Sequence, residues 1–310
     1  MIRRSTIRKT SLRHDVKAMA RGFRWGRRSL LPRSVEPRAI AHRDYPTAWA
    51  RTEAGKAARA FLQAYGLAPL IRLETTPRVE GADALEGLRP PVIFVANHSS
   101  HLDAPLVLTS LPPAWRERTA TGAAADYFFD VWWRAAATAL VFNAFPVERG
   151  RGKGGRTTAL ARELLAERWN ILMFPEGTRS KDGWVRDLRM GAARLAAEAA
   201  VPVVPIGIRG SYQAMPRGRG WPAPGRPPVV VRFGRAVHPL PGEDPAVLNA
   251  RIRTGLAVTL DEERTSWWDA QRRAARDETP PIDGPAGANW RRMWEASRPL
   301  PQRRKVFPRR

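Results

Sequence analysis

Between residues 70 and 240, short apolar runs rich in β-branched residues alternate with segments of helical periodicity. A short apolar run without charges fits a strand buried in a sheet, and the helices between such runs would cover that sheet. The predicted strands are residues 91–96, 144–147, 170–174, 201–208 and 229–237. The predicted helices are residues 45–65, 103–111, 157–169, 191–200 and 244–263. The pattern predicts an α/β fold, a layered domain with a largely parallel or mixed sheet flanked by helices.

Two details of this pattern limit individual elements. Gly66 and Pro69 follow the Ala-rich segment 45–65, and these residue types predict the end of that helix. The run at 201–208 contains two prolines, which cannot donate to a sheet ladder, so this strand is expected at an edge or an end of the sheet.

The chain has 310 residues and no cysteine. This length suits one or two domains, and the absence of thiols excludes disulfides, cysteine-ligated zinc, iron–sulfur clusters and a cysteine nucleophile. The longest stretches without a charged residue have 13 residues, at 90–102 and 135–147, whereas a membrane-spanning helix needs about 20 apolar residues. Because the N-terminus lacks the apolar core of a secretory signal, we expect a cytoplasmic protein.

The net charge of +24 is concentrated at the two ends of the chain. Residues 1–43 contribute +11 and residues 291–310 contribute +7. Such tails favour polyanions, either nucleic acid or the anionic face of a membrane. In the first arm, Leu12, Val16, Met19 and Phe23 recur at helical spacing among basic residues, which predicts an amphipathic helix in the membrane interface. The competing prediction is a disordered basic arm, since Gly22 and Gly26 disfavour a rigid helix.

A polar segment directly follows the apolar run 91–96. It reads Asn97-His98-Ser99-Ser100-His101-Leu102-Asp103 and leads into the predicted helix 103–111. Open α/β sheets place their sites where parallel strands end. An Asp five positions after His98 can orient one imidazole nitrogen and leave the other as a general base. The alternative is an Asp that caps the helix beside a packed His.

A second polar segment, Phe174-Pro175-Glu176-Gly177-Thr178-Arg179-Ser180, directly follows the run 170–174. Gly177 would let the backbone approach an anion closely, and Arg179 could bind a phosphate with two parallel hydrogen bonds. The alternative is a polar turn with a surface Arg.

Together the two segments resemble the glycerolipid acyltransferase family, which transfers acyl chains to glycerol phosphates and lysophospholipids. Asn97, His98, Ser100 and Asp103 match the family's first signature in full, and residues 174–180 match its third. The second signature is matched more loosely at 145–149, where Arg149 is its basic residue. The fourth fits 201–208, with Pro205 as the central proline. The resemblance covers roughly residues 75–240, and it divides the chain into a basic arm at 1–43, an acyltransferase domain at 44–263 and an Arg/Trp/Pro-rich tail at 264–310.

The resemblance implies a mechanism and a set of site residues. His98 would deprotonate the acceptor hydroxyl, Asp103 would orient His98, and the alkoxide would attack an acyl thioester carried by coenzyme A or acyl-carrier protein. The implied substrate-binding residues are Asn97, Ser100, Arg149, Glu176, Gly177, Thr178, Arg179 and Pro205. No metal or cofactor is implied beyond the thioester co-substrate. The expected acceptor is lysophosphatidate, with glycerol 3-phosphate or another lysophospholipid as alternatives.

Because both substrates are amphiphiles and no spanning helix is expected, the enzyme would act as a peripheral protein on the inner face of the cell membrane. Three other functions remain less favoured. Residues 150–155 match the dinucleotide pattern G-x-G-x-x-G, and His98, His101 and Asp103 could suggest a metal-dependent hydrolase. Nucleic-acid binding by the tails leaves both polar segments unexplained, so no nucleic-acid partner is expected.

Overall fold

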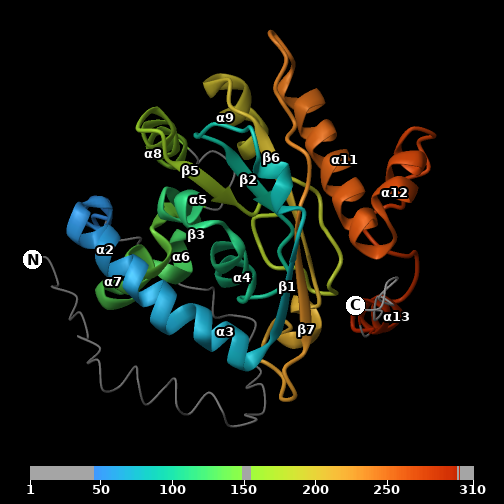
Figure 1. The fold of residues 1–310 in the computed structure, drawn as a ribbon, viewed down its shortest axis with the longest axis horizontal. Coiled ribbons are helices and arrows are strands. Elements are labelled where there is room, and N and C mark those ends of the chain that lie inside the picture. The colour runs from blue at the N-terminus through green and yellow to red at the C-terminus, as the bar shows by residue number, and fades with distance from the viewer. Residues whose placement is uncertain (1–44, 149–154, 299, 301–310) are drawn as a thin grey trace, which may run out of the picture. The chain divides into compact units, whose positions relative to one another are not determined.

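The computed structural model describes residues 45–148, 155–298 and 300. Within these residues seven strands form one sheet in the order β1-β7-β6-β2-β5-β3-β4 (Figure 1). The strands are β1 (Thr76–Glu80), β2 (Ile93–Ala96), β3 (Thr119–Ala124), β4 (Ala144–Val147), β5 (Asn170–Met173), β6 (Val203–Arg209) and β7 (Pro228–Phe233). The predicted α/β class with a mixed sheet is confirmed.

The directions of the strands determine where loops gather. Neighbouring strands are parallel throughout the sheet except for β6 and β7, which are antiparallel. Strands β2, β5 and β6 therefore run in the same direction and are adjacent, with Val95 opposite both Met173 and Pro205. As a result, the segments that follow β2 and β5 leave the sheet side by side at the same edge.

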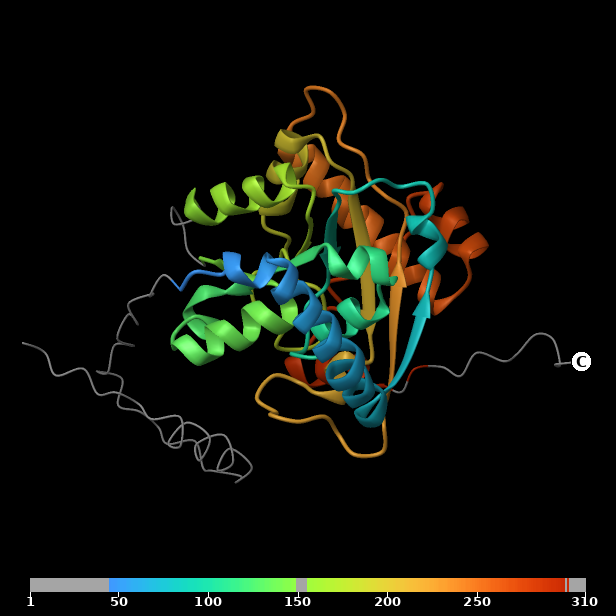
Figure 2. The ribbon, with the colours of Figure 1, turned by 60° about the vertical axis from the view of Figure 1, so that its left-hand side comes forward.

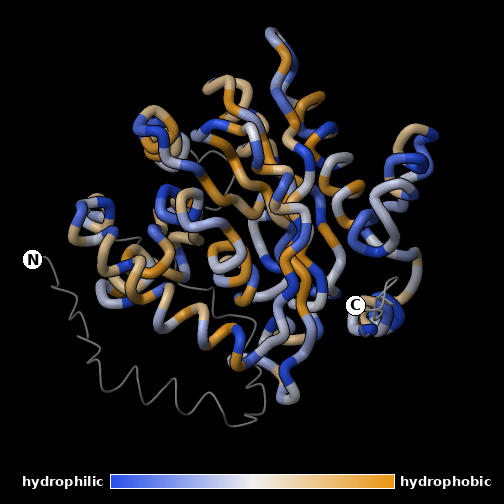
Figure 3. Tube along the Cα trace, in the orientation of Figure 1, coloured by the Kyte–Doolittle hydropathy of each residue, from blue (hydrophilic) through white to orange (hydrophobic). Residues whose placement is uncertain are grey.

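Helices cover both faces of the sheet, as the views in Figures 1 and 2 show. On one face lie α8 (Gly155–Ala166), α9 (Gly191–Ala199) and α11 (Pro245–Arg264), and on the other lie α2 (Glu53–Leu62), α3 (Ala68–Glu74), α4 (Asp103–Ser110) and α7 (Trp132–Phe142). Side chains of β2 alternate between the two cores, because successive residues of a strand point to opposite faces. Ile93 and Val95 join the core under α8, α9 and α11, while Phe94 and Ala96 join the core under α4. Figure 3 shows hydrophobic residues concentrated in the central strands.

The helix expected to end near Gly66 and Pro69 instead continues through both. A 3-10 turn at Ala48–Arg51 precedes α2, and a π-helical turn at Gln63–Leu67 joins α2 to α3, in which Pro69 occupies the first turn. A proline inside a regular helix clashes with the preceding carbonyl. The wider π turn, in which the amide of Ala68 donates to the carbonyl of Gln63, relieves that crowding.

The strand expected at an edge is central. Strand β6 lies between β7 and β2. Of its two prolines, Pro202 precedes the strand, and Pro205 lies where the β6–β7 ladder ends, with its carbonyl accepting from the amide of Gly234. Because Pro205 lies at the end of the β6–β7 ladder, its lack of an amide proton removes no hydrogen bond from the interior of that ladder.

The segment after residue 264, in which the sequence shows no clear period, forms two short helices. These are α12 (Trp267–Ala274) and α13 (Asn289–Ala296). Among the described residues, no helix combines the length and the apolar character that crossing a bilayer requires. The predicted amphipathic helix at residues 12–23 and the dinucleotide-like loop at 150–154 lie outside the described residues.

Candidate active site

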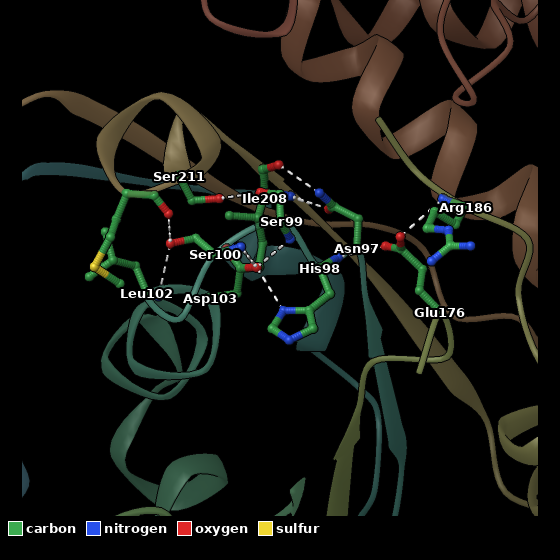
Figure 4. Close-up of polar contacts among 11 residues, drawn as sticks. Asn97, His98, Ser99, Ser100, Leu102, Asp103, Glu176, Arg186, Ile208 and Ser211 are labelled. Carbon is green, nitrogen blue, oxygen red and sulfur yellow. Dashed lines mark hydrogen bonds and ion pairs between the residues drawn. The ribbon is translucent and has the colours of Figure 1, made fainter. Parts of the chain in front are cut away.

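The turn between β2 and α4 is organised by the carboxylate of Asp103, which is fully buried. Its Oδ2 accepts hydrogen bonds from the backbone amides of Ser99 at 2.7 Å and Ser100 at 2.8 Å, and contacts Nδ1 of His98 at 2.9 Å (Figure 4). The helix-cap alternative does not hold, because residue 102 occupies the cap position and no side chain caps α4. The predicted His98–Asp103 pair is present in the structure.

This pairing defines the state of the imidazole. Because an ionised carboxylate only accepts hydrogen bonds, Nδ1 of His98 carries the proton and donates it to Asp103. Nε2 is then the nitrogen with a free lone pair. The ring is held on its flat side as well, since it stacks on Phe174 with centroids 4.3 Å apart and planes inclined by 29°. The arrangement is that of an oriented general base.

Asn97 and Ser100 support this turn instead of lining the pocket. The side-chain amide of Asn97 donates to the carbonyl of Ile208 at 2.9 Å and accepts from its amide at 2.7 Å, which ties the end of β2 to β6. The hydroxyl of Ser100 donates to the carbonyl of Met215 at 2.8 Å and accepts from the amide of Leu102 at 3.1 Å. Both side chains are buried, as is Pro205 within β6. The structure therefore places these three predicted substrate-binding residues in the supporting framework.

Glu176 joins the two polar segments. Its carboxylate accepts from the amide of His98 at 2.6 Å and from the amide of Arg186 at 3.0 Å (Figure 4). The amide of Ser180 in turn donates to the carbonyl of His98 at 2.7 Å. Burial raises the pKa of Glu176 from its ordinary value of 4.5 to about 7, and the two amide donors oppose that rise. Glu176 is thus a bridge between the loops, with a charge that changes near neutral pH.

The rest of the second segment forms one side of the pocket. Gly177, Thr178 and Arg179 all line it. Gly177 has a φ of +70°, a conformation that side chains disfavour, and a Cβ there would lie 2.6 Å from Nε of Arg189. The position therefore requires glycine, and the tight turn aims the following residues at the pocket beside His98.

The pocket has a volume of about 470 Å³ and a largely apolar wall. Apart from the residues already described, its lining comes from β3, α4, α6 (Ala125–Phe128), α7 and β4, and it includes Ala104, Pro105, Thr121, Gly122, Ala123, Ala124, Tyr127, Phe128, Thr138, Phe142, Ala144 and Val147. Arg217, from the segment between α10 (Ser211–Ala214) and β7, also lines it. One pocket thus combines a base, two guanidinium groups and an apolar chamber, which suits a ligand with an anionic head and an apolar chain.

Several of these residues were not predicted from the sequence. Arg217 lies in an Arg-Gly-rich stretch that shows no pattern, and Phe174 was placed at the end of a strand and in the second polar segment, without a role in holding His98. The apolar wall is assembled from elements distant in the chain, so no local signal could have revealed it. Arg149, predicted to bind phosphate, lies outside the described residues.

His101 also lines the pocket, where it stacks on Tyr127 with centroids 5.5 Å apart. Burial, together with the nearby Arg179 cation and His98, lowers the pKa of His101 to about 4, so its ring is neutral at neutral pH. Across residues 45–148, 155–298 and 300, no three His, Asp or Glu side chains converge in a way that could hold a metal ion. The described residues therefore give no support to the metal-hydrolase alternative.

Comparisons with known proteins show what this chain resembles. The model of the family described as Acyltransferase matches residues 74–209. A chloroplastic 1-acyl-sn-glycerol-3-phosphate acyltransferase of Arabidopsis thaliana is 31% identical over 186 residues, which are 59% of this chain and 49% of that protein. The 1-acyl-sn-glycerol-3-phosphate acyltransferase alpha of Mus musculus is 28% identical over 178 residues, 56% of this chain and 59% of that protein. The chain thus spans about half the length of these relatives.

A solved structure extends the similarity to the fold. The 1-acyl-sn-glycerophosphate (LPA) acyltransferase PlsC of Thermotoga maritima matches with a TM-score of 0.52 and 25% sequence identity. The match covers 72% of this chain and 85% of that one. The similarity therefore reaches well beyond the two polar segments.

Proposed function

We propose that this chain, like the acyltransferases that it matches, transfers a fatty acyl chain from an acyl thioester to the free hydroxyl of lysophosphatidate, giving phosphatidate. The observation that carries the proposal is the His98–Asp103 pair at the wall of an apolar pocket that Arg179 also lines. The names of the relatives and of the solved structure support this acceptor. The donor is an acyl thioester of coenzyme A or of acyl-carrier protein.

The chemical steps follow from the geometry of the pair. Nε2 of His98 takes the proton of the acceptor hydroxyl as its oxygen attacks the thioester carbonyl, and Asp103 stabilises the imidazolium that forms. The tetrahedral intermediate collapses, the carbon–sulfur bond breaks, and the imidazolium returns the proton to the leaving thiolate. A histidine suits both transfers because its ordinary pKa lies near neutral pH. No covalent acyl-enzyme and no metal are required, since the thioester is already reactive.

The acceptor phosphate is held by cationic groups that line the same pocket. Arg179 and Arg217 both line the pocket, and Arg149 is proposed as a third cation on the basis of its sequence alone. A guanidinium group matches a phosphate with paired, charge-assisted hydrogen bonds. Glu176 and Gly177 act indirectly by shaping the turn that presents Arg179.

A membrane surface is the proposed place of action. The basic arm at residues 1–43 is one element suited to it. Within the described residues, α2, the π turn and α3 expose Phe61, Tyr65 and Leu73, and the rings of Phe61 and Tyr65 lie 5.0 Å apart. We expect removal of residues 1–43 to release the protein from anionic vesicles in a salt-dependent manner, with activity on detergent-dispersed acceptor retained. Equal co-sedimentation of full-length and truncated protein would contradict the role of the arm.

The test of the proposed reaction is an acyl-transfer assay in detergent. Purified protein is incubated with labelled acyl-coenzyme A or acyl-carrier protein and with lysophosphatidate, glycerol 3-phosphate or another lysophospholipid, and the ester formed is identified. His98→Ala is expected to abolish transfer, whereas His238→Ala, an exposed histidine outside the pocket, serves as the matched control. Turnover by His98→Ala at a rate near that of the wild type would refute the mechanism.

A further inference from the structure

The short helix α13 turns an apolar face toward solvent. Trp290 is 72% exposed, Met293 44% and Trp294 61%. Residues three and four apart lie on the same side of a helix, so these three side chains form one stripe. Ser297, one turn further on, extends the stripe beyond the end of the helix. Because apolar side chains of a folded protein normally face its interior, this orientation requires an explanation.

The opposite side of α13 is fixed to the body of the protein. Nε of Arg292 pairs with Oδ2 of Asp182 at 2.6 Å, and its two terminal nitrogens donate to the carbonyls of Pro285 and Asp283. Nε1 of Trp184 donates to the carbonyl of Arg292 at 2.9 Å. The exposure of the stripe is therefore imposed by specific contacts on the other side of the helix.

These contacts attach α13 to the loop that leaves the active site. Oδ1 of Asp182 accepts from the hydroxyl of Ser180 at 2.9 Å, and the amide of Ser180 donates to the carbonyl of His98. The helix therefore lies at the edge of the sheet where β2 and β5 end, the edge that holds the pocket. Figures 1 and 2 show α13 beside this end of the sheet.

Basic side chains outnumber acidic ones around the stripe. Lys181, Arg186, Arg291 and Arg298 are exposed near it, and the guanidinium of Arg298 lies 5.5 Å from the ring of Trp294. Two acidic side chains, Asp187 and Asp283, are exposed there as well, whereas Glu295 pairs with Arg291 and Asp182 pairs with Arg292. Residues 291–310 hold eight basic residues and one acidic residue. Tryptophan favours the boundary between water and hydrocarbon, and arginine is attracted to anionic headgroups. Both preferences are met by the surface of an anionic bilayer.

We propose that α13 is a membrane-docking helix whose stripe of Trp290, Met293 and Trp294 enters the interface of an anionic bilayer. The proposal rests on the proposed function insofar as the acceptor of that reaction resides in a bilayer. It assigns to α13 a contact separate from the N-terminal arm. The attachment through Arg292 and Asp182 keeps the bilayer close to the loop that presents Arg179.

The first experiment measures partition of the full chain onto vesicles of phosphatidylcholine and phosphatidylglycerol. The variant Trp290→Ser/Trp294→Ser is expected to lower the partition constant at least about tenfold, because two interfacial aromatic anchors are lost. The matched control is Trp268→Ser on α12, since Trp268 is 73% exposed and lies outside the stripe. Its partition constant is expected to stay within about twofold of the wild type. Equal loss in both variants, or no loss in the double variant, would overturn the proposal.

A second measurement leaves both tryptophans in place. Since the chain has no native cysteine, one environment-sensitive fluorophore can be attached at Ser297→Cys, on the stripe, or at Ala166→Cys, at the end of α8 where β5 begins. On anionic vesicles we expect a blue shift at position 297 and none at 166. An unchanged spectrum at 297 with the protein bound would overturn the proposal.

The alternative occupant of the stripe is a second copy of the chain. If a second copy covers the stripe, the protein should be a dimer in the absence of lipid, and Trp290→Ser/Trp294→Ser should convert it to a monomer. The vesicle partition constant of that variant should then equal that of the wild type. This combination of results would also overturn the proposal. Vesicle binding and labelling do not depend on turnover. Failure of the proposed acyl transfer in detergent can therefore be distinguished from failure of membrane docking by α13.

Discussion

The replacement Glu176→Gln tests how the two loops of the site are held together. Both carboxylate oxygens accept from backbone amides, those of His98 and Arg186. A glutamine presents one oxygen and one NH₂ group, so one of the two amides would face another donor. Leaving a buried donor unsatisfied costs about 1–3 kcal/mol. We therefore expect the variant to be less stable than the wild type at low pH.

The same replacement removes a pH dependence whose sign can be worked out. Since folding raises the pKa of Glu176 from 4.5 to about 7, the native state holds this proton more tightly than the unfolded state. The free energy of unfolding therefore decreases as the pH rises from about 4.5 through 7. With these two pKa values, the free energy of unfolding is lower than at acidic pH, where Glu176 is protonated in both states, by about 0.8 kcal/mol at pH 5 and by about 3.3 kcal/mol at pH 8. Glutamine does not ionise, so residue 176 of the variant makes no contribution to the pH dependence of stability.

Urea denaturation of both proteins at pH 5 and pH 8 measures the effect. The free energy of unfolding of the wild type minus that of Glu176→Gln is expected to fall by about 2.5 kcal/mol between pH 5 and pH 8, so that the variant is the more stable protein at pH 8. Glu167→Gln, which replaces an exposed carboxylate, is measured alongside as the control. A difference that stays constant within about 0.5 kcal/mol for Glu176→Gln would refute a buried, proton-binding carboxylate at this position.

Four further replacements address the proposed catalytic pair, the arginines proposed to bind phosphate, and the framework. Asp103→Asn should lower kcat in the detergent assay less than His98→Ala does, because the imidazole remains but loses its orienting anion. Comparable losses in both variants would contradict this ranking. Arg179→Ala and Arg217→Ala should each raise the acceptor KM about 10- to 100-fold, reflecting about 1.5–3 kcal/mol of charge-assisted binding. An effect confined to the donor KM would show that neither residue binds the acceptor. Asn97→Ala should lower the free energy of unfolding by about 2–4 kcal/mol in urea melts, since it deletes two buried hydrogen bonds to β6. A loss below about 1 kcal/mol would show that the amide does not tie the strands.

The parts of the site that could be predicted from sequence are those encoded locally. A buried apolar run followed at once by polar residues predicts a strand end, and the His98–Asp103 pair spans only five positions. The partners of Asn97 and Ser100 are 111 and 115 residues away, so their use as framework could not be predicted. The local sequence around His98 does not distinguish a polar side chain that contacts substrate from one that bonds a carbonyl far along the chain.

The missed strands have a similar physical origin. Strand β3 reads TATGAA, which lacks bulky apolar residues, and β1 reads TPRVE at a half-exposed edge. Each contains β-branched residues, but neither has the run of bulky apolar residues by which a buried strand is predicted. These two segments form strands because neighbouring strands provide hydrogen bonds and packing, and those contacts cannot be predicted from the segments' own sequences.

The position of the two loops on adjacent strands has a consequence for how the site comes into existence. The contact between His98 and Asp103 closes a loop of a few residues, whereas the bond from Glu176 to the amide of His98 joins residues 78 positions apart. Closing the longer loop costs more chain entropy and requires β5 to pair with β2. The local contact between His98 and Asp103 therefore does not depend on β5, whereas the position of residues 174–180 does. Residues 176–179 can therefore take up their positions in the pocket only after β5 has paired with β2. During refolding, the amides of His98 and Arg186 should become protected from hydrogen exchange when that pairing is complete.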